Sequence, residues 1–164
     1  MSLFSIFLVL ATFFCSLVAG FLFAFSVVVM PGVRSLSDGE FIRAFQGMDG
    51  IIQANNPLFV VVWLGSIVSL IACAVLGAMH SPMVDRIVLF GAAGAYFLMV
   101  QLPTFRINIP LNNFIQSLDT SSMDATKFEE ARHHFEPRWN WWNKFRTISS
   151  SLVVVMLILV LYRS

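Results

Sequence analysis

Two short stretches of this 164-residue chain concentrate amide, guanidinium and indole side chains at regular spacing. The first stretch is TFRINIPLN at residues 104–112, and the second is WNWWNKFRT at residues 139–147. Carboxamide and guanidinium groups donate hydrogen bonds that stabilise a negatively charged oxygen, and indole rings stack on flat apolar molecules. Together these residue types could form the polar and aromatic walls of one small-molecule pocket.

The first stretch is interrupted by proline and alternates polar with apolar residues, so we expect an extended backbone there. In an extended chain, side chains two residues apart share a face, and Arg106, Asn108 and Asn112 would then form one polar wall. Extended backbone beside a bilayer must be buried in protein or line a wet cavity. The alternative is a solvated loop at the membrane interface.

The second stretch has the spacing of a helix. Trp139, Asn143 and Arg146 recur at intervals of three and four residues, so they would lie along one stripe. Pro137 suits the first turn of a helix, which predicts that the fourth helix begins there, well before its apolar part. Trp142 and its neighbours also have the composition of an interfacial aromatic belt, but a belt does not require an amide and a guanidinium group beneath it.

Titratable side chains close to the second stretch could act as a base. His133 and His134 are candidates because imidazole changes its protonation near neutral pH, whereas Glu136 would need burial. The same two histidines are the candidate ligands if the protein binds a metal or haem. Adjacent helical residues point about 100° apart, and His80 is expected at the opposite membrane face, so one shared ion is awkward. We therefore expect no cofactor, with haem, copper or iron on His133 or His134 as the alternative.

Four long apolar runs separate these polar stretches. Hydrophobic residues make up 58% of the chain and charged residues 12%, with a mean hydropathy of +0.82, which is typical of a membrane protein. Each run is long enough, alone or with flanking residues, to cross about 30 Å of hydrocarbon as a helix. The sequence predicts a single all-α domain over residues 1–164, an integral membrane four-helix bundle with spans at about 4–30, 57–79, 86–103 and 146–162.

The segments between the spans predict a cap over one face of the bundle. An SDGE capping-box motif followed by apolar residues at helical intervals indicates an amphipathic helix from Asp38 to about Gln53. A second short helix is expected at residues 127–135. Asn56 precedes Pro57 at the start of the second span, and capping explains only one of the two adjacent asparagines there. The cap, built from the first and third loops with the extended segment, is where we expect the pocket.

Basic residues are distributed unequally between the two sides of this topology. Arg86 and Arg163 lie on one side, and eight lie on the other. The eight are Arg34, Arg43, Arg106, Lys127, Arg132, Arg138, Lys144 and Arg146. The positive-inside rule places the first and third loops in the cytoplasm and both termini outside, which suits a bacterial inner membrane. The net charge of +1 implies no nucleic-acid partner, while membrane lipids are expected partners.

Four segments carry a resemblance to a known family. They are the phenylalanine-rich run at residues 20–31, NPLF at 56–59, the stretch at 104–112 and the stretch at 139–147. In these segments the chain resembles the anthrone-oxygenase-like proteins, small four-span membrane proteins found in fungi and bacteria. The resemblance implies a four-helix membrane fold. It also implies an activity that some members have, the oxidation of a polyketide anthrone to an anthraquinone with dioxygen.

That activity gives the polar residues specific roles. Anthrones are acidic at the carbon between two rings, and the enolate formed there can itself reduce dioxygen, so the protein must supply a base, oxyanion donors and an aromatic slot. The expected catalytic residues are His133, His134, Arg146 and Asn143. The expected substrate-binding residues are Asn56, Arg106, Asn108, Asn112, Trp139 and Trp142. A small apolar aromatic substrate and dioxygen are the expected partners.

The sequence leaves two other classes of function open. One is a haem- or metal-binding membrane redox protein, and the other is a non-enzymatic tetraspan module that binds lipid or a partner subunit. Convergence of the polar residues on one cavity would favour a small-molecule site, and a scattered arrangement would favour scaffolding. The identity of the substrate, catalysis itself and assembly into a homo-oligomer are not decided by the sequence.

Overall fold

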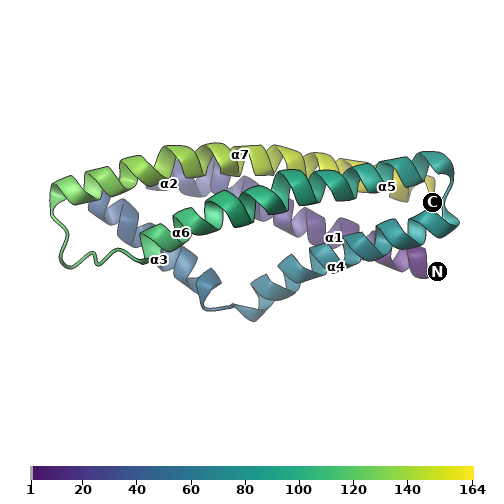
Figure 1. The fold of residues 1–164 in the computed structure, drawn as a ribbon, viewed down its shortest axis with the longest axis horizontal. Coiled ribbons are helices and arrows are strands. Elements are labelled where there is room, and N and C mark those ends of the chain that lie inside the picture. The colour runs from purple at the N-terminus through teal and green to yellow at the C-terminus, as the bar shows by residue number, and fades with distance from the viewer. Residues whose placement is uncertain (1) are drawn as a thin grey trace.

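The computed structural model describes residues 2–164, except for the side chain of His80. All elements in this range are helical (Figure 1). In chain order they are α1 (Leu3–Ala24), η1 (Phe25–Val29), α2 (Met30–Val33), α3 (Asp38–Gln53), α4 (Pro57–His80), α5 (Met83–Ala95), η2 (Tyr96–Gln101), η3 (Thr104–Asn108), α6 (Ile109–Gln116) and α7 (Ala125–Arg163), where η marks a π-helical segment.

These elements join into four rods that run along the long axis. The first rod is α1, η1 and α2, the second is α3 and α4, the third is α5, η2, η3 and α6, and the fourth is α7. The N- and C-termini lie at the same end of the molecule (Figure 1). Four stretches are long and apolar enough to cross a membrane: Leu3–Val33, Pro57–Met79, Met83–Gln116 and Ala125–Arg163. Large apolar side chains such as Leu58 and Leu98 are 77% and 67% exposed, as lipid-facing residues are. The predicted all-α four-helix membrane bundle is confirmed, and the chain is an integral multi-pass membrane protein.

The bundle has two apolar cores. The first lies within the membrane spans and packs Leu8, Tyr96 and Leu157 together, with the free thiols of Cys15 and Cys73 as buried small residues. The second lies in the cap, where α3, α6 and the first half of α7 meet; its buried residues are Met30, Phe41, Ile42, Phe45, Leu111, Ile115, Ala131, Phe135 and Trp139. The cap exists because the rods are longer than the bilayer is thick.

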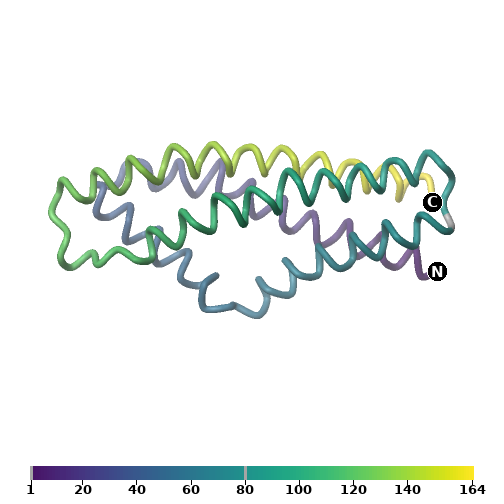
Figure 2. The backbone as a smooth tube through the Cα atoms, in the orientation of Figure 1, coloured from purple at the N-terminus to yellow at the C-terminus, as the bar shows by residue number. Residues whose placement is uncertain are grey.

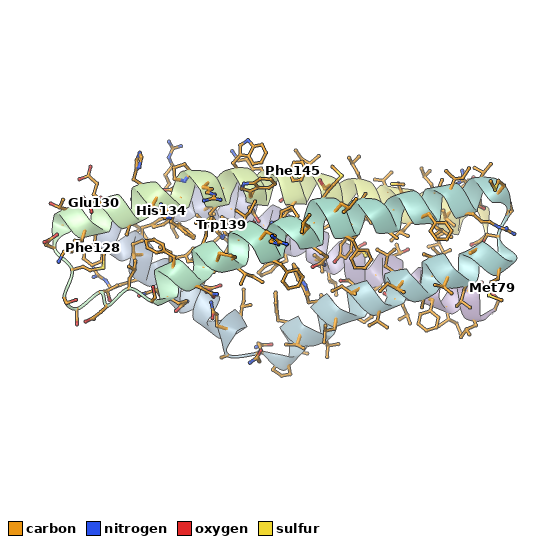
Figure 3. All side chains as sticks on the ribbon, viewed as in Figure 1. Met79, Phe128, Glu130, His134, Trp139 and Phe145 are labelled. Atoms are coloured by element: carbon orange, nitrogen blue, oxygen red, sulfur yellow. The ribbon has the colours of Figure 1, made fainter. Side chains whose placement is uncertain are left out.

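The length of α7 shows this clearly. Its 39 residues span roughly 58 Å, about twice the hydrocarbon thickness of a bilayer. Figure 3 places Met79 at one end of the molecule, Phe128 and Glu130 at the other, and Trp139 between them. The far half of α7 therefore extends out of the membrane and carries the charged residues of the cap.

Arg132 on α7 links α7 to the start of α3 in the cap. Its guanidinium pairs with Asp38 at the start of α3 at 3.0 Å and with Glu136 on its own helix at 2.7 Å. It also lies over the ring of Phe41, 4.4 Å from the ring centre. These contacts hold the start of α3 against α7 and so fix where the rest of α3 lies.

The second rod is broken between α3 and α4, and the two helices form a V in the backbone trace (Figure 2). Asn55 has φ of 56°, in the left-handed region that asparagine tolerates better than most residues. The side chain of Asn56 then caps α4 by accepting from the backbone N–H groups of Leu58 and Phe59, and Pro57 occupies the first turn. The apex of this V, where α3 ends and α4 begins, lies away from the third rod (Figure 2).

The prediction of an extended segment at residues 104–112 is wrong, because this stretch is helical throughout. Proline lacks an N–H group and clashes with the carbonyl four residues earlier in a regular α-helix. Here Pro31, Pro103 and Pro110 each follow a π-helical turn that displaces this carbonyl and keeps the helix continuous. The backbone N–H of the residue before each proline donates to the carbonyl five residues earlier, and this bond closes the wider turn. The donor and acceptor residues are Met30 and Phe25, Leu102 and Phe97, and Ile109 and Thr104.

The predicted start of the fourth helix at Pro137 is also wrong. Pro137 lies inside α7, and the short helix expected at residues 127–135 is the first part of the same continuous helix. Pro137 is on the exposed side, so the carbonyl that loses its helical hydrogen bond there can be solvated. Sequence alone could not distinguish a proline in the first turn of a helix from one on the wet face of a long helix.

Candidate functional site

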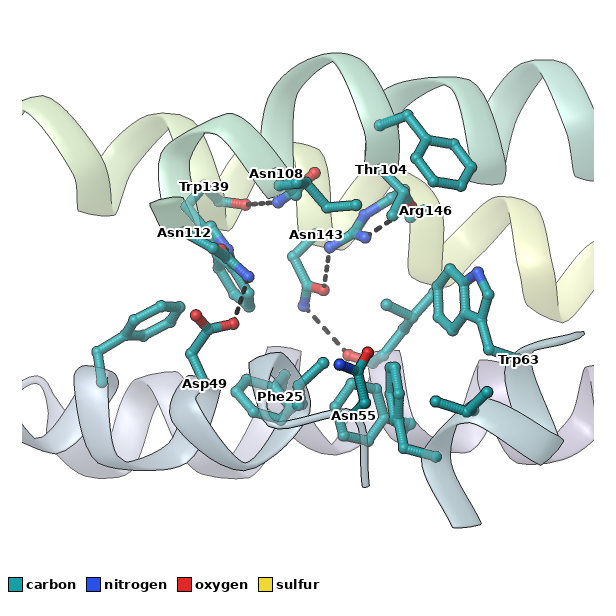
Figure 4. A pocket seen from close by; sticks show the side chains of 18 of the residues that line it. Phe25, Asp49, Asn55, Trp63, Thr104, Asn108, Asn112, Trp139, Asn143 and Arg146 are labelled. Carbon is teal, nitrogen blue, oxygen red and sulfur yellow. Dashed lines mark hydrogen bonds between the residues drawn. The ribbon is translucent and has the colours of Figure 1, made fainter. Parts of the chain in front are cut away.

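A cavity of about 370 Å³ lies between the two cores, where α3 and α4 diverge from the third rod (Figure 4). Its polar lining residues are Asp49, Asn55, Thr104, Asn108, Asn112, Asn143 and Arg146. Its aromatic lining residues are Phe21, Phe25, Phe45, Phe59, Trp63, Phe105 and Trp139. The first and third rods contribute through η1 and η3, so the π-helical turns that accommodate the prolines also shape the cavity wall.

Arg146 forms a positive pole of the cavity. It is 4% exposed, and its two terminal nitrogens donate to Thr104 Oγ1 at 2.9 Å and Asn143 Oδ1 at 3.1 Å. Asn143 is held in turn by donating through Nδ2 to the Leu22 carbonyl at 3.1 Å and Ser26 Oγ at 2.8 Å. In the described part of the chain, Arg146 has no carboxylate partner. A buried guanidinium without an anion is costly at membrane depth, and such groups mark functional sites.

Two atoms at this pole have no hydrogen-bond partner among the residues described. One is the Arg146 Nε donor, and the other is the Asn108 Oδ1 acceptor. Asn108 is 3% exposed, and its Nδ2 makes only a long 3.5 Å bond to the Trp139 carbonyl. Because buried polar atoms are nearly always paired, these two atoms, one donor and one acceptor, mark the part of the site whose hydrogen bonding is incomplete.

A carboxylate lies at the other end of the cavity. Asp49 is 3% exposed, and three carboxamides donate to it. Asn112 Nδ2 donates to Oδ1 at 2.7 Å, while Gln116 and Gln53 both donate to Oδ2 at 3.0 Å. The donors come from α6 and from α3 itself, so the carboxylate is held between two elements of the cap.

The sequence analysis did not identify Asp49, although a signal was present. Phe41, Phe45 and Asp49 follow each other at four-residue intervals and all three are buried on one face of α3. A carboxylate on the apolar face of an amphipathic helix is unusual, since ionisable residues are rarely buried without a partner. That pattern was sufficient to select Asp49 as a site residue.

Aromatic rings form the walls between the two poles. Trp139 packs against Phe25 with ring centres 5.7 Å apart and edge-on against Phe45 at 5.5 Å. Phe59 and Trp63 stack at 5.6 Å on the α4 side. Such walls suit a flat apolar molecule, with polar groups needed only at its two ends.

The structure brings five of the predicted site residues to this cavity: Asn108, Asn112, Trp139, Asn143 and Arg146. Arg106 is not among them, and it is exposed. In the helix that replaces the expected extended chain, Asn108 and Asn112 share a face with Thr104, while Arg106 points roughly the opposite way. The expected polar wall therefore contains Asn108 and Asn112 but not Arg106.

Four other predicted residues lie outside the cavity lining. His133 and His134 are exposed on α7, with the His134 ring edge-on to Phe114 at 5.0 Å. Trp142 packs edge-on with its neighbour Trp141 at 4.7 Å, in the manner of an interfacial belt. Asn56 serves as the cap of α4, and the adjacent Asn55 lines the cavity instead. Among the described side chains there is no cluster of three His, Cys, Asp or Glu arranged to hold a metal ion.

Four membrane spans around one pocket, with a guanidinium at one end and a carboxylate at the other, define a multi-pass membrane protein with a candidate small-molecule site. The anthrone oxygenase family model matches residues 58–156, more than half of the chain. The chain belongs to the anthrone oxygenase family and is an oxygenase-like membrane protein. No curated protein and no solved structure matches it. The matched range includes Arg146 and Asn108 but begins after α3, so it does not contain Asp49.

Proposed function

We propose that the cavity binds a flat aromatic ketone with an acidic C–H group, of the anthrone type, and oxidises it with dioxygen. Family membership supports the class of reaction, and the apolar aromatic walls support the class of substrate. The substrate oxygen lies against Arg146, and the rings lie between Phe25, Trp139 and Trp63.

The buried guanidinium of Arg146 is the observation that carries this proposal. Thr104 and Asn143 orient two of its nitrogens, and its Nε has no hydrogen-bond partner among the residues described. A donor that is fixed in place before the reaction stabilises the charge that develops on an enolate oxygen, and it does so most strongly where water is excluded. Arg146 is 4% exposed and lies beside a largely aromatic lining, which lowers its contact with water.

The proposed reaction balances without a further reductant. A base removes one proton from the acidic carbon, and the electron pair of the C–H bond moves into the ring to give the enolate. The enolate gives one electron to dioxygen, and the resulting radical and superoxide combine to form a C–O bond. The peroxide oxygen takes up the proton, and loss of water from the hydroperoxide leaves a second ketone. The net change is CH₂ plus O₂ to C=O plus H₂O.

His133 and His134, the bases expected from the sequence, lie on the exposed surface of α7. Their exposure and their absence from the cavity lining argue against direct proton abstraction, because a base must come within hydrogen-bond reach of its proton. The same placement offers little support for haem or metal chemistry at this site. Convergence of Asn108, Asn143 and Arg146 on one cavity favours a small-molecule site over a lipid-binding or scaffolding module.

The test uses the protein purified into lipid nanodiscs, with anthrone as the probe. Dioxygen uptake and anthraquinone formation are followed together, against empty nanodiscs. We expect turnover by the wild type and a loss of about 100-fold in Arg146→Ala, the effect of removing one oxyanion donor. Arg146→Lys, which keeps the charge but changes the donor geometry, is expected to lie between them.

Arg138→Ala is the matched control, because Arg138 is exposed on the same helix and outside the cavity. It should retain full activity. Anthrone oxidation no faster than in empty nanodiscs, or equal loss of activity in the Arg138 and Arg146 variants, would overturn the proposal. Intrinsic tryptophan fluorescence on addition of anthraquinone reports binding separately from turnover.

A further inference from the structure

A carboxylate buried to 3% exposure in the cap of a membrane protein needs an explanation. Desolvating an ionisable group is costly unless it is paired, and Asp49 has no cationic partner among the residues described. Three neutral amides hold it instead. An apolar residue at this position would extend the cap core without that cost, so packing alone does not account for Asp49.

The hydrogen bonds to Asp49 leave one acceptor position available. A carboxylate offers about four lone-pair sites, two on each oxygen. Gln53 and Gln116 occupy both sites of Oδ2, while Asn112 occupies one site of Oδ1. Asp49 itself lines the cavity, and the remaining Oδ1 site has no partner among the residues described.

Asp49 and Arg146 occupy different ends of the cavity and do not form an ion pair (Figure 4). Asn112, which bonds to Asp49, and Thr104, which bonds to Arg146, are eight residues apart on the same rod, so the two groups are held about two helical turns from each other.

The opposed placement of the two groups corresponds to the proposed substrate. In an anthrone the ketone and the acidic carbon lie at opposite corners of the central ring. A protein that stabilises the enolate oxygen at one corner must therefore place its base at the other. Arg146 at one end of the cavity and Asp49 at the other have this opposed arrangement.

We propose that Asp49 is the catalytic base, an inference that rests on the proposed function of the cavity. Asp49 Oδ1 takes the proton as the C–H bond breaks, and the electron pair moves across the ring to the oxygen beside Arg146. The protonated carboxyl then returns this proton to the peroxide formed after addition of dioxygen. Asn112, Gln53 and Gln116 are positioning residues that aim Oδ1 at the ring.

Proton abstraction can be measured without dioxygen. Anthrone deuterated at the acidic carbon is incubated anaerobically with the protein in nanodiscs, and loss of deuterium to water is followed by mass spectrometry. We expect the wild type to accelerate this exchange and Asp49→Asn to lower the protein-dependent rate by about 100-fold or more, as for loss of a general base. Asp49→Glu keeps a carboxylate and should recover part of the rate. Anthraquinone should bind to Asp49→Asn within about threefold of the wild type.

Glu130→Gln is the matched control, because it removes an exposed carboxylate far from the cavity (Figure 3). If Asp49→Asn does not fold, wild-type protein treated with the hydrophobic reagent dicyclohexylcarbodiimide replaces it. We then expect an adduct on Asp49, protection by anthraquinone, and loss of exchange in proportion to modification. Exchange that persists in Asp49→Asn or in fully modified protein overturns the assignment of the base.

The two proposals fail in different ways. Wild-type protein that exchanges deuterium but does not oxidise anthrone in air contradicts the proposed function and leaves Asp49 as a base. Wild-type protein that oxidises anthrone while Asp49→Asn exchanges at the wild-type rate contradicts only the role of Asp49. Equal exchange rates in Asp49→Glu and Asp49→Asn also contradict the role of Asp49 as a base, because a carboxylate at this position would then not accelerate the exchange.

Discussion

Trp139 Nε1 donates to Asn112 Oδ1 at 2.8 Å, and this bond decides which way the Asn112 carboxamide faces. With its oxygen turned to the indole, Asn112 directs Nδ2 to Asp49 Oδ1 at 2.7 Å. Trp139 on α7 thus orients a carboxylate on α3 through an amide on α6. A single indole N–H links the aromatic wall of the cavity to its acidic end.

Trp139→Phe tests this link because it keeps a ring in the wall and removes only the N–H donor. Without that donor the Asn112 amide is free to turn, and Asp49 Oδ1 loses its fixed direction. We expect a lower kcat for anthrone oxidation, by about tenfold, and a loss of about 1 kcal/mol in the free energy of unfolding, as for one hydrogen bond. Steady-state kinetics and denaturant unfolding in detergent provide the two measurements.

Trp142→Phe is the control for this substitution. Trp142 lies three residues away on α7 and contacts Trp141 and Phe145 outside the cavity lining. Its kcat and KM should match those of the wild type. A kcat for Trp139→Phe that equals the wild-type value would show that the indole N–H does not orient the site.

Helical periodicity was sufficient to place Asn143 and Arg146 correctly. Both lie on one stripe of α7 with Trp139, and this part of the stripe faces the cavity. The four-helix membrane architecture was equally accessible, since the length and apolarity of the runs determine it.

Other parts of the site depend on contacts that periodicity does not contain. Pro103 and Pro110 argue locally for extended backbone, and only the π-helical turns that precede them allow a helix. Asp49 becomes a site residue because α3 packs against α6, which brings Gln116 and Asn112 to it from more than 60 residues away. Sequence spacing within one helix cannot predict contacts between side chains on two different helices.

Asn143→Ala is expected to weaken both the fold and the positive pole. The change removes the acceptor of one Arg146 nitrogen and the donor to Leu22 and Ser26, which leaves buried polar groups without partners. We expect a loss of about 1–3 kcal/mol in the free energy of unfolding and a fall in kcat/KM. Asn140→Ala is the comparison, since Asn140 lies on the same helix outside this cavity. Equal stability of the two variants would contradict the buried network.

The start of α3 should make stability depend on pH. Ser37 donates its hydroxyl at 2.6 Å and its backbone N–H at 2.9 Å to the Glu40 carboxylate, and these bonds lower the pKa of Glu40. A carboxyl with a lower pKa in the folded state stabilises the protein above its unfolded pKa of about 4.5. That contribution is lost as the pH falls through the folded value.

Glu40→Gln removes this dependence. We expect the wild type to melt at a higher temperature than Glu40→Gln near neutral pH, and the difference to shrink as the pH falls below about 4.5. Thermal unfolding in detergent across this range is the measurement, with the exposed Glu130→Gln as a variant that should show no such difference. A gap between wild type and Glu40→Gln that stays constant with pH would mean that Glu40 contributes nothing through its charge.

The excess of basic residues on the cap side predicts that the cap faces the cytoplasm. Ser121, in the loop between α6 and α7, and Ser164, at the C-terminus, lie at opposite ends of the molecule and are both exposed, so each accepts a cysteine. The native Cys15 and Cys73 are fully buried and leave little background. In intact cells a membrane-impermeant maleimide should label Ser164→Cys at once and Ser121→Cys only after permeabilisation. The reverse labelling pattern would place the cap and its cavity outside the cytoplasm and the C-terminus inside it.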